Sequence, residues 1–177
     1  ASVVAIEGRQ VDSSYGPPDF HTLSPMELVA TPEERASLLA APARGSEEGA
    51  ARVFLEPHTN AVRMDDQVPA SWARGGEKTQ LRLNASAGEY LTFQVGVLAL
   101  ANLSAFQLDF GEMRRVAAGG AAPLAGAVPA SAFTCFNLGG VDYHGRPFTA
   151  NYTLAAGAVG SLWVGVDVPT SAAGTQQ

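Results

Sequence analysis

The sequence predicts an all-β protein with one or two short helices near its N-terminus. From Arg52 onward, apolar and polar residues alternate with a period of two in several short segments. This pattern is typical of antiparallel strands that have one face on a core and one on water. Gly- and Pro-rich connections separate the segments. A set of about seven short strands of this kind favours an antiparallel β-sandwich of the jelly-roll or immunoglobulin-like type.

Residues 1–50 are expected to form an N-terminal arm that contains the helices. Ser24-Pro25-Met26-Glu27 and Thr31-Pro32-Glu33-Glu34 each place a hydroxyl at the N-cap, a proline at N1 and a glutamate at N3. The hydroxyl can accept a hydrogen bond from the N3 amide while the glutamate accepts one from the cap amide, and proline has no amide to lose at N1. We expect the helical segment to end near Ala41-Pro42.

Residues 51–177 are expected to form the β-sandwich domain. The strands are expected at Val53–Leu55, Thr79–Ser86, Glu89–Ala99, Ala105–Phe110, Ala132–Leu138 and Ser161–Val168. In the last of these, Trp163 and Asp167 share the face opposite to the valines, so we expect this face to meet solvent or a neighbouring domain. Residues 117–131 are rich in Ala, Gly and Pro, and we expect them to form a long surface loop.

Composition and charge argue against two classes of partner. The net charge is −6, Lys78 is the only lysine, and the pair Arg114–Arg115 is the largest basic cluster. Because nucleic acids and anionic membrane surfaces are held by clustered Lys and Arg side chains, we expect neither as a partner. We also expect no insertion into a membrane, since the sequence has no run of about 20 apolar residues.

The sequence lacks the short motifs that mark nucleophile elbows, zinc proteases, phosphate-binding loops and dinucleotide-binding folds. We therefore expect no catalytic residue, no cofactor and no metal site in this chain. Cys135 is the single cysteine and lies in an apolar run, where a buried thiol is favoured over a nucleophile. Asp142 and His144 could share a proton or a metal, but the glycines around them favour a turn.

Three side chains are candidates for contact with a glycan. Trp72 is expected in a loop, where its ring could stack on a sugar, although a single tryptophan more often packs in a core. Tyr143 and His144 lie in the glycine-rich segment 139–146, which is expected to be an exposed turn. A phenol and an imidazole on such a turn could line a sugar-binding surface.

Three Asn-X-Ser/Thr triplets indicate the secretory route. They begin at Asn84, Asn102 and Asn151, and none has proline in the middle position, so each is a candidate site of N-glycosylation. We therefore expect a secreted, extracellular or lumenal protein. The alternative, in which the triplets occur by chance in a bacterial or cytosolic protein, stays open at this point.

Two stretches of the sequence resemble a known family. The first is Ala87–Val95, which reads AGEYLTFQV, and the second is Leu162–Pro169, which reads LWVGVDVP and is followed by Ala173-Gly174-Thr175. Together they resemble motifs in the N-terminal β-sandwich of glycoside hydrolase family 123-like proteins, which carry a DUF4091-type catalytic barrel. Within these motifs, Glu89 and Gln94 are expected to satisfy backbone groups near a strand end.

The resemblance implies that the chain is a non-catalytic N-terminal accessory domain, truncated before a C-terminal catalytic barrel. Family members are similar to β-N-acetylgalactosaminidases, in which the 2-acetamido group of the substrate attacks the anomeric carbon beside an Asp–Glu pair of the barrel. No catalytic residue carries over to this chain. The implied partners are the barrel of the same chain and a glycan or glycolipid substrate. The alternative is a glycan-binding or structural β-sandwich module of a surface glycoprotein.

Overall fold

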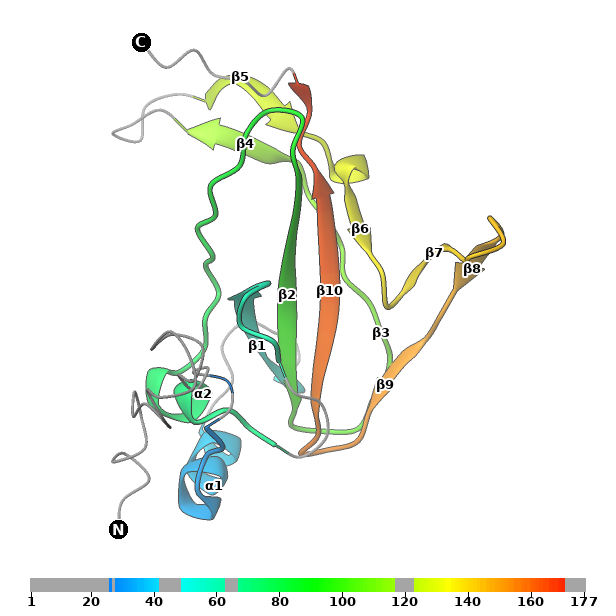
Figure 1. Cartoon of the computed structure of the whole chain (residues 1–177). Coiled ribbons are helices and arrows are strands. Elements are labelled where there is room, and N and C mark those ends of the chain that lie inside the picture. Colours follow the sequence, from blue (N-terminus) through cyan, green and yellow to red (C-terminus); the bar gives the residue numbers. More distant parts are fainter. Residues whose placement is uncertain (1–25, 27, 42–48, 63–66, 117–122, 171–177) are drawn as a thin grey trace, which may run out of the picture.

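The computed structural model describes residues 26, 28–41, 49–62, 67–116 and 123–170. Its centre is an antiparallel sheet with the strand order β1-β2-β10-β6. The strands of this main sheet are β1 (Ala51–Pro57), β2 (Tyr90–Ala99), β10 (Val159–Asp167) and β6 (Phe133–Cys135). The two longest strands, β2 and β10, pair along their whole lengths in the middle of the sheet (Figure 1).

Among the described residues, three antiparallel ribbons of two strands accompany the main sheet. They are β3 (Leu103–Phe106) with β9 (Tyr152–Leu154), β4 (Met113–Val116) with β5 (Pro123–Val128), and β7 (Gly139–Val141) with β8 (Pro147–Thr149). The helices are α1 (Pro32–Ala40), α2 (Ala70–Gly75) and the short 3-10 turn η4 (Ala130–Ala132). The predicted antiparallel β-rich fold is confirmed, and the sheets that the described residues form are small and not closed.

Helix α1 begins as its sequence predicts. The Thr31 hydroxyl accepts a hydrogen bond from the Glu34 amide at 3.2 Å, and the Glu34 carboxylate accepts one from the Thr31 amide at 2.9 Å. Glu34 also accepts from Arg74 of α2 at 2.8 Å, and this bond, followed by that from Thr31, holds the pKa of Glu34 below its usual value. The second predicted cap, at Ser24-Pro25-Met26-Glu27, lies largely outside the described residues.

The strand register divides the main sheet into two faces. Residues directly opposite each other in an antiparallel pair lie on the same face. Phe54 lies opposite Gly96 of β2, which lies opposite Ser161 of β10, so these three share what we call the helix-side face. The other face, which we call the ribbon-side face, carries the strand residues that alternate with these, including Val95 and Leu162.

Helices α1 and α2 cover one end of the helix-side face. The Trp72 ring stacks on Phe54 with a centroid distance of 4.0 Å and an interplanar angle of 3°. It also lies so close to Gly96 that a Cβ added there would overlap it. The first core combines these residues with apolar side chains of α1, the flanking segments and the sheet: Met26, Ala30, Leu38, Phe54, Val62, Val68, Trp72, Leu98 and Val159.

The β3–β9 ribbon covers part of the ribbon-side face. Its Tyr152 and Leu154 pack over Gly160, where a Cβ would overlap the Tyr152 hydroxyl. This hydroxyl accepts a hydrogen bond from the Ser161 amide at 3.0 Å and donates one to the Ser161 carbonyl at 3.3 Å. Strand β6 pairs with β10 only at Val164–Val166. The Tyr152 hydroxyl therefore provides hydrogen-bond partners for the β10 backbone at Ser161, where β6 does not pair with it.

Replacing Tyr152 by phenylalanine is expected to lower the free energy of unfolding by about 1 kcal/mol, since both backbone groups of Ser161 lose a partner. Burial raises the pKa of Tyr152 above its usual value of 10.0. The unfolded chain therefore releases this proton first, so the contribution of Tyr152 to stability is constant below about pH 10 and is lost as the pH rises through the folded pKa.

Phenolate absorbance during alkaline titration checks this prediction. The tyrosine with the raised pKa should disappear from the titration of Tyr152→Phe, and unfolding above about pH 10 should lose part of its pH dependence. The matched control is Tyr143→Phe, which removes a phenol that is 92% exposed and keeps the Tyr152 phenol in place. A titration of Tyr152→Phe that still contains a tyrosine with a raised pKa, and lacks one with the usual pKa, would contradict the assignment.

Three predictions about individual segments are wrong. Thr79–Ser86 keeps the expected alternation, with Leu81 and Leu83 half-buried between exposed neighbours, but it pairs with no strand among the described residues. The loop predicted over 117–131 is contradicted at Pro123–Val128, whose backbone pairs with β4 as strand β5 although its sequence has no apolar–polar alternation. The strand predicted at Ala105–Phe110 ends at Phe106, beyond a register shift at which Ala105 adopts φ 56°.

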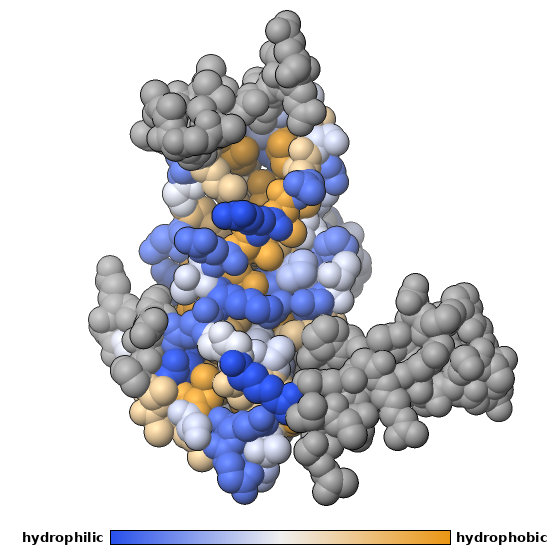
Figure 2. Space-filling model, turned by 90° about the vertical axis from the view of Figure 1, so that its left-hand side faces the viewer, coloured by the Kyte–Doolittle hydropathy of each residue, from blue (hydrophilic) through white to orange (hydrophobic). Residues whose placement is uncertain are grey.

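The unpaired segment 79–86 forms one wall of an open apolar cleft of about 640 Å³ on the ribbon-side face. The floor and the other walls come from the strands of the main sheet and from the β4–β5 ribbon: Leu55, Leu91, Phe93, Met113, Val128, Phe133, Val166 and Val168. Figure 2, which looks at the molecule from the side of segment 76–89, shows hydrophobic surface between hydrophilic residues. The described residues leave this apolar surface open.

Candidate functional site

Trp72, the first sugar-contact candidate, lies in the core. It belongs to helix α2, not to a loop, and its side chain has 0% exposure. Its indole nitrogen donates a hydrogen bond to Glu56 at 3.1 Å. The packing alternative that the sequence left open therefore describes Trp72, and its ring cannot meet an external sugar in this structure.

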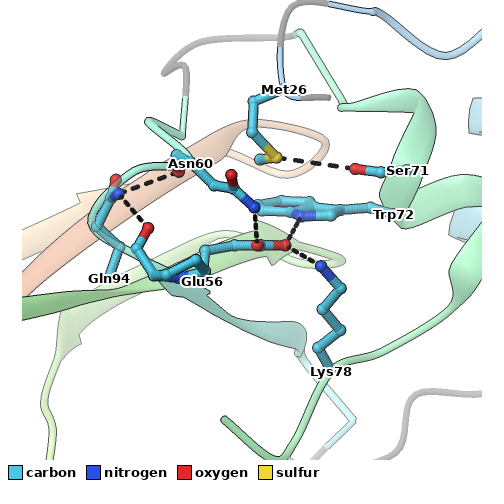
Figure 3. A network of polar contacts seen from close by, with 8 residues as sticks. Met26, Glu56, Asn60, Ser71, Trp72, Lys78 and Gln94 are labelled. Carbon is cyan, nitrogen blue, oxygen red and sulfur yellow. Dashed lines mark hydrogen bonds and ion pairs between the residues drawn. The ribbon is translucent and has the colours of Figure 1, made fainter. Parts of the chain in front are cut away.

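Glu56 is the centre of a buried polar network beneath Trp72 (Figure 3). Its Oε1 accepts hydrogen bonds from the indole of Trp72 and from Lys78 Nζ at 2.8 Å, and its Oε2 accepts one from Asn60 at 3.0 Å. A buried carboxylate is tolerated when it is paired and hydrogen-bonded in this way. The network joins β1, the turn that follows it, and the segment after α2.

Gln94 extends this network across the sheet. Its Oε1 accepts from the Val62 amide at 3.1 Å and from the Ser161 hydroxyl at 3.2 Å. Its Nε2 donates to the carbonyls of Pro57 and Asn60 at 3.3 and 3.0 Å. All donor and acceptor positions of the amide are thus close to partners, which confirms the expectation that Gln94 satisfies backbone groups. The prediction that this face of the strand meets water is wrong here, because Gln94 is fully buried.

Tyr143 and His144 lie at the tip of the β7–β8 ribbon, which projects away from the main sheet (Figure 1). Their rings lie side by side, with centroids 3.8 Å apart. Asp142 Oδ1 accepts hydrogen bonds from the amides of His144 and Arg146 at 2.9 and 2.8 Å. The turn interpretation of this segment is therefore confirmed, and the Asp142 carboxylate is engaged by the turn backbone.

The three predicted glycosylation sites are all on the surface. Asn84, Asn102 and Asn151 are exposed. Asn102 Oδ1 accepts a hydrogen bond from the Ala156 amide at 2.9 Å, and its Nδ2, the atom to which a glycan would attach, takes no part in that bond. Cys135, by contrast, is a buried free thiol, as the sequence predicts.

A second group of aromatic side chains lies on the part of the helix-side face that the helices do not cover. Tyr90, Phe136 and Trp163 are 54%, 45% and 36% exposed. They gather around Gly165: a Cβ added to this glycine would overlap the Tyr90 phenol and lie 2.8 Å from the Phe136 ring. Trp163 precedes Gly165 by two residues on the same face of β10. We call these three side chains the aromatic face.

Backbone contacts fix the position of two members of this face. The Phe136 amide donates to the Trp163 carbonyl at 2.9 Å, and the Asn137 side chain accepts from the Trp163 amide at 2.6 Å. At the start of β2, Glu89 accepts a hydrogen bond from the Ser86 amide at 2.6 Å, as its place in the motif predicts. This bond closes the turn that leads into Tyr90.

A polar groove of about 680 Å³ adjoins the aromatic face. Tyr90 belongs to both, and Asp167 lies directly opposite Tyr90 on β10. The groove is lined further by hydroxyl-bearing side chains and by residues of the turns at either end: Gly88, Pro129, Ser131, Ala132, Thr134, Val168, Pro169 and Thr170. Rings beside a carboxylate and several hydroxyls can combine stacking with hydrogen bonding.

Sequence reasoning found half of this site. The period-two pattern places Trp163 and Asp167 on one exposed face, and the structure confirms it. Tyr90 and Phe136 were missed because each lies at a strand end, where alternation says little about orientation. The signal that could have found them is Gly165, since a glycine in the middle of a strand often marks a close approach by another group.

The described part of the chain holds no group of three or more His, Cys, Asp or Glu side chains that could bind a metal ion. Among these residues, no helix is long and apolar enough to cross a membrane. Comparison with models of protein families gives no match for this chain. A search of curated proteins gives no match either.

Proposed function

We propose that this chain is a non-catalytic accessory β-sandwich domain of a secreted glycoside hydrolase 123-like protein. In this proposal a (β/α)8-like barrel of the same chain carries the β-N-acetylgalactosaminidase chemistry, in which the substrate's acetamido group takes part. The accessory domain supports the barrel and contacts its glycan or glycolipid substrate. The main sheet is one layer of the proposed sandwich, and the ribbons on its ribbon-side face form the other.

The observation that carries this proposal is the pairing of the two stretches that resemble the family. They are about 70 residues apart in sequence, yet they form the central strand pair β2–β10, with Tyr90 opposite Asp167 and Gln94 opposite Trp163. The motif residues thus have two distinct roles. Gln94 and Glu89 hold the backbone in place. Tyr90, Trp163 and Asp167 lie on the part of the helix-side face that the helices do not cover.

Determining the sequence of the transcript downstream of the Gln177 codon tests the accessory-domain proposal. We expect several hundred further residues with alternating strands and helices and an adjacent Asp-Glu pair at the end of a strand. The longer protein should hydrolyse an aryl β-N-acetylgalactosaminide, and the chain of 177 residues alone should not. A stop codon, or only further β-domains, would overturn the proposal.

A glycan-binding module without an enzyme is the second candidate. The observation that favours it is the aromatic face itself, because a surface that binds glycans by itself needs no barrel. The same transcript separates the candidates, since this alternative predicts no barrel downstream. A purely structural module predicts several copies of this domain in one protein.

Glycosylation at the three surface triplets is the expected result of passage through the secretory route. When the chain is expressed in mammalian cells behind a signal peptide, digestion with a peptide-N-glycosidase should lower its mass and convert Asn84, Asn102 and Asn151 to aspartate. Intact-mass and peptide mass spectrometry measure both changes. An unmodified chain in the medium would contradict the assignment of these sites, and Thr153→Ala should remove modification at Asn151 alone.

A further inference from the structure

We infer that the aromatic face and the adjoining groove bind a neutral saccharide. The inference deepens the proposed function, on which the choice of a glycan as ligand rests, and assigns the contact to Tyr90, Phe136, Trp163 and Asp167. These residues differ from the sugar-contact candidates that the sequence indicates, one of which, Trp72, is buried.

The shape of the face matches the chemistry of a pyranose ring. One side of such a ring presents C–H bonds, whose partial positive charge meets the negative face of an aromatic ring, while its hydroxyls point outward from the rim. Gly165 allows the rings of Tyr90 and Phe136 to lie over the strand, because it has no side chain to hold them away. The result is a surface on which a sugar can stack.

The groove supplies partners for the hydroxyls of a stacked sugar. Tyr90 lines the groove as well as the face, so a sugar stacked there lies beside Asp167 and the Thr134 hydroxyl. A carboxylate accepts hydrogen bonds from hydroxyl donors through both of its oxygens. The volume of about 680 Å³ falls within the usual range for ligand sites, about 300–1,000 Å³.

Charge selects a neutral ligand. Among the described residues, Asp167 is the only charged one that lines the groove, and the whole chain carries a net charge of −6, so sulfated or uronic glycans meet repulsion. A second protein is a poorer fit than a sugar. Its apolar surface would cover the Asp167 carboxylate and the Thr134 hydroxyl without giving them hydrogen bonds, which is unfavourable.

Titration with four neutral tetrasaccharides tests the inference: β-linked N-acetylgalactosamine, N-acetylglucosamine, galactose and glucose. Calorimetry should detect binding of at least one of them to the folded chain. The chain has two tryptophans, and Trp72 is buried, so binding should change the emission of Trp163 and leave that of Trp72 unchanged. Measuring Trp163→Phe, which retains only Trp72, checks this assignment.

Variants locate the binding surface. Tyr90→Ala and Trp163→Ala should each weaken binding at least about tenfold, as loss of a central aromatic contact does, and Asp167→Asn should weaken it several-fold. Gly165→Ala should weaken binding without removing any ring, because its methyl group displaces Tyr90. Circular dichroism must show that each variant is folded. A sulfated heparin tetrasaccharide should bind less well than the neutral ligand.

The matched control is Tyr143→Ala, which removes a phenol that is even more exposed but lies outside the face, and it should leave the affinity unchanged. The inference is overturned if no neutral tetrasaccharide binds at up to about 10 mM, or if Tyr143→Ala abolishes binding and Tyr90→Ala does not. Either result leaves standing the proposal that the chain precedes and supports a catalytic barrel, because that part depends on the downstream sequence, and removes only the glycan contact of this domain.

Discussion

Replacing Trp72 by alanine is expected to lower the free energy of unfolding by about 3–5 kcal/mol. Since domains of this size are stable by only about 5–15 kcal/mol, the variant should be largely unfolded under mild denaturing conditions. Three losses add together. The ring stacked on Phe54 disappears, a cavity opens above Gly96, and the buried Glu56 carboxylate loses one of its donors.

Urea unfolding followed by circular dichroism measures this effect. The matched control is Trp163→Ala, which removes the same side chain from a position that is 36% exposed and should cost clearly less than Trp72→Ala. This pair of variants also separates the two tryptophans by role, because stability should depend on Trp72 and saccharide binding on Trp163. If the two variants lose the same stability, the account of the helix-side core is wrong.

Replacing Glu56 by alanine is expected to destabilise the fold by about 2–3 kcal/mol. The carboxylate accepts from Trp72, Asn60 and Lys78, and its removal leaves the buried indole N–H without an acceptor, which costs about 1–3 kcal/mol by itself. The Lys78 ammonium is partly exposed and can return to water, so its loss adds less than that of a fully buried ion pair.

The same unfolding experiment measures Glu56→Ala against Asp109→Ala. Asp109 is an exposed carboxylate outside the described strands, and its removal should change stability by no more than about 0.5 kcal/mol. A double variant, Glu56→Ala with Trp72→Phe, should lose less than the sum of the two single effects, because both changes break one contact. Strict additivity would contradict the network.

The parts of the fold that follow from local chemistry could be predicted from sequence. The capping box at Thr31 and Glu34 involves residues three positions apart, and the turn around Asp142 uses the side chain of that residue. The alternation along β2 and β10 shows which of their residues share a face. None of these features requires knowledge of a distant partner.

The failures concern partners that are distant in sequence. A strand exists only where another backbone pairs with it. For this reason the apolar–polar alternation at 79–86 predicted a strand that does not form, while Pro123–Val128 forms a strand although its sequence does not alternate. Gln94 was expected to face water because polar residues on alternate positions usually do. It is buried because the segment after β1 covers it and bonds to it through Pro57, Asn60 and Val62, and no local pattern indicates that covering.

The candidate site also combines residues that local sequence predicts with residues that depend on distant partners. Trp163 and Asp167 could be placed on one face by their spacing of four along a strand. The contribution of Phe136 depends on the approach of the segment after β6 to Gly165, and that of Tyr90 depends on the β2–β10 register. The sequence therefore predicted the face and two of its members, while the groove beside it required the fold.

Amide chemical-shift mapping tests most directly whether this domain contacts a glycan through its aromatic face. Adding the four neutral tetrasaccharides to the isotope-labelled chain should shift amides around Tyr90, Phe136 and Trp163–Asp167. The amides of the β7–β8 turn and of helix α2 should stay in place. Shifts confined to Tyr143 and His144, or no shifts with any of the four sugars, would contradict the assignment of glycan contact to this face.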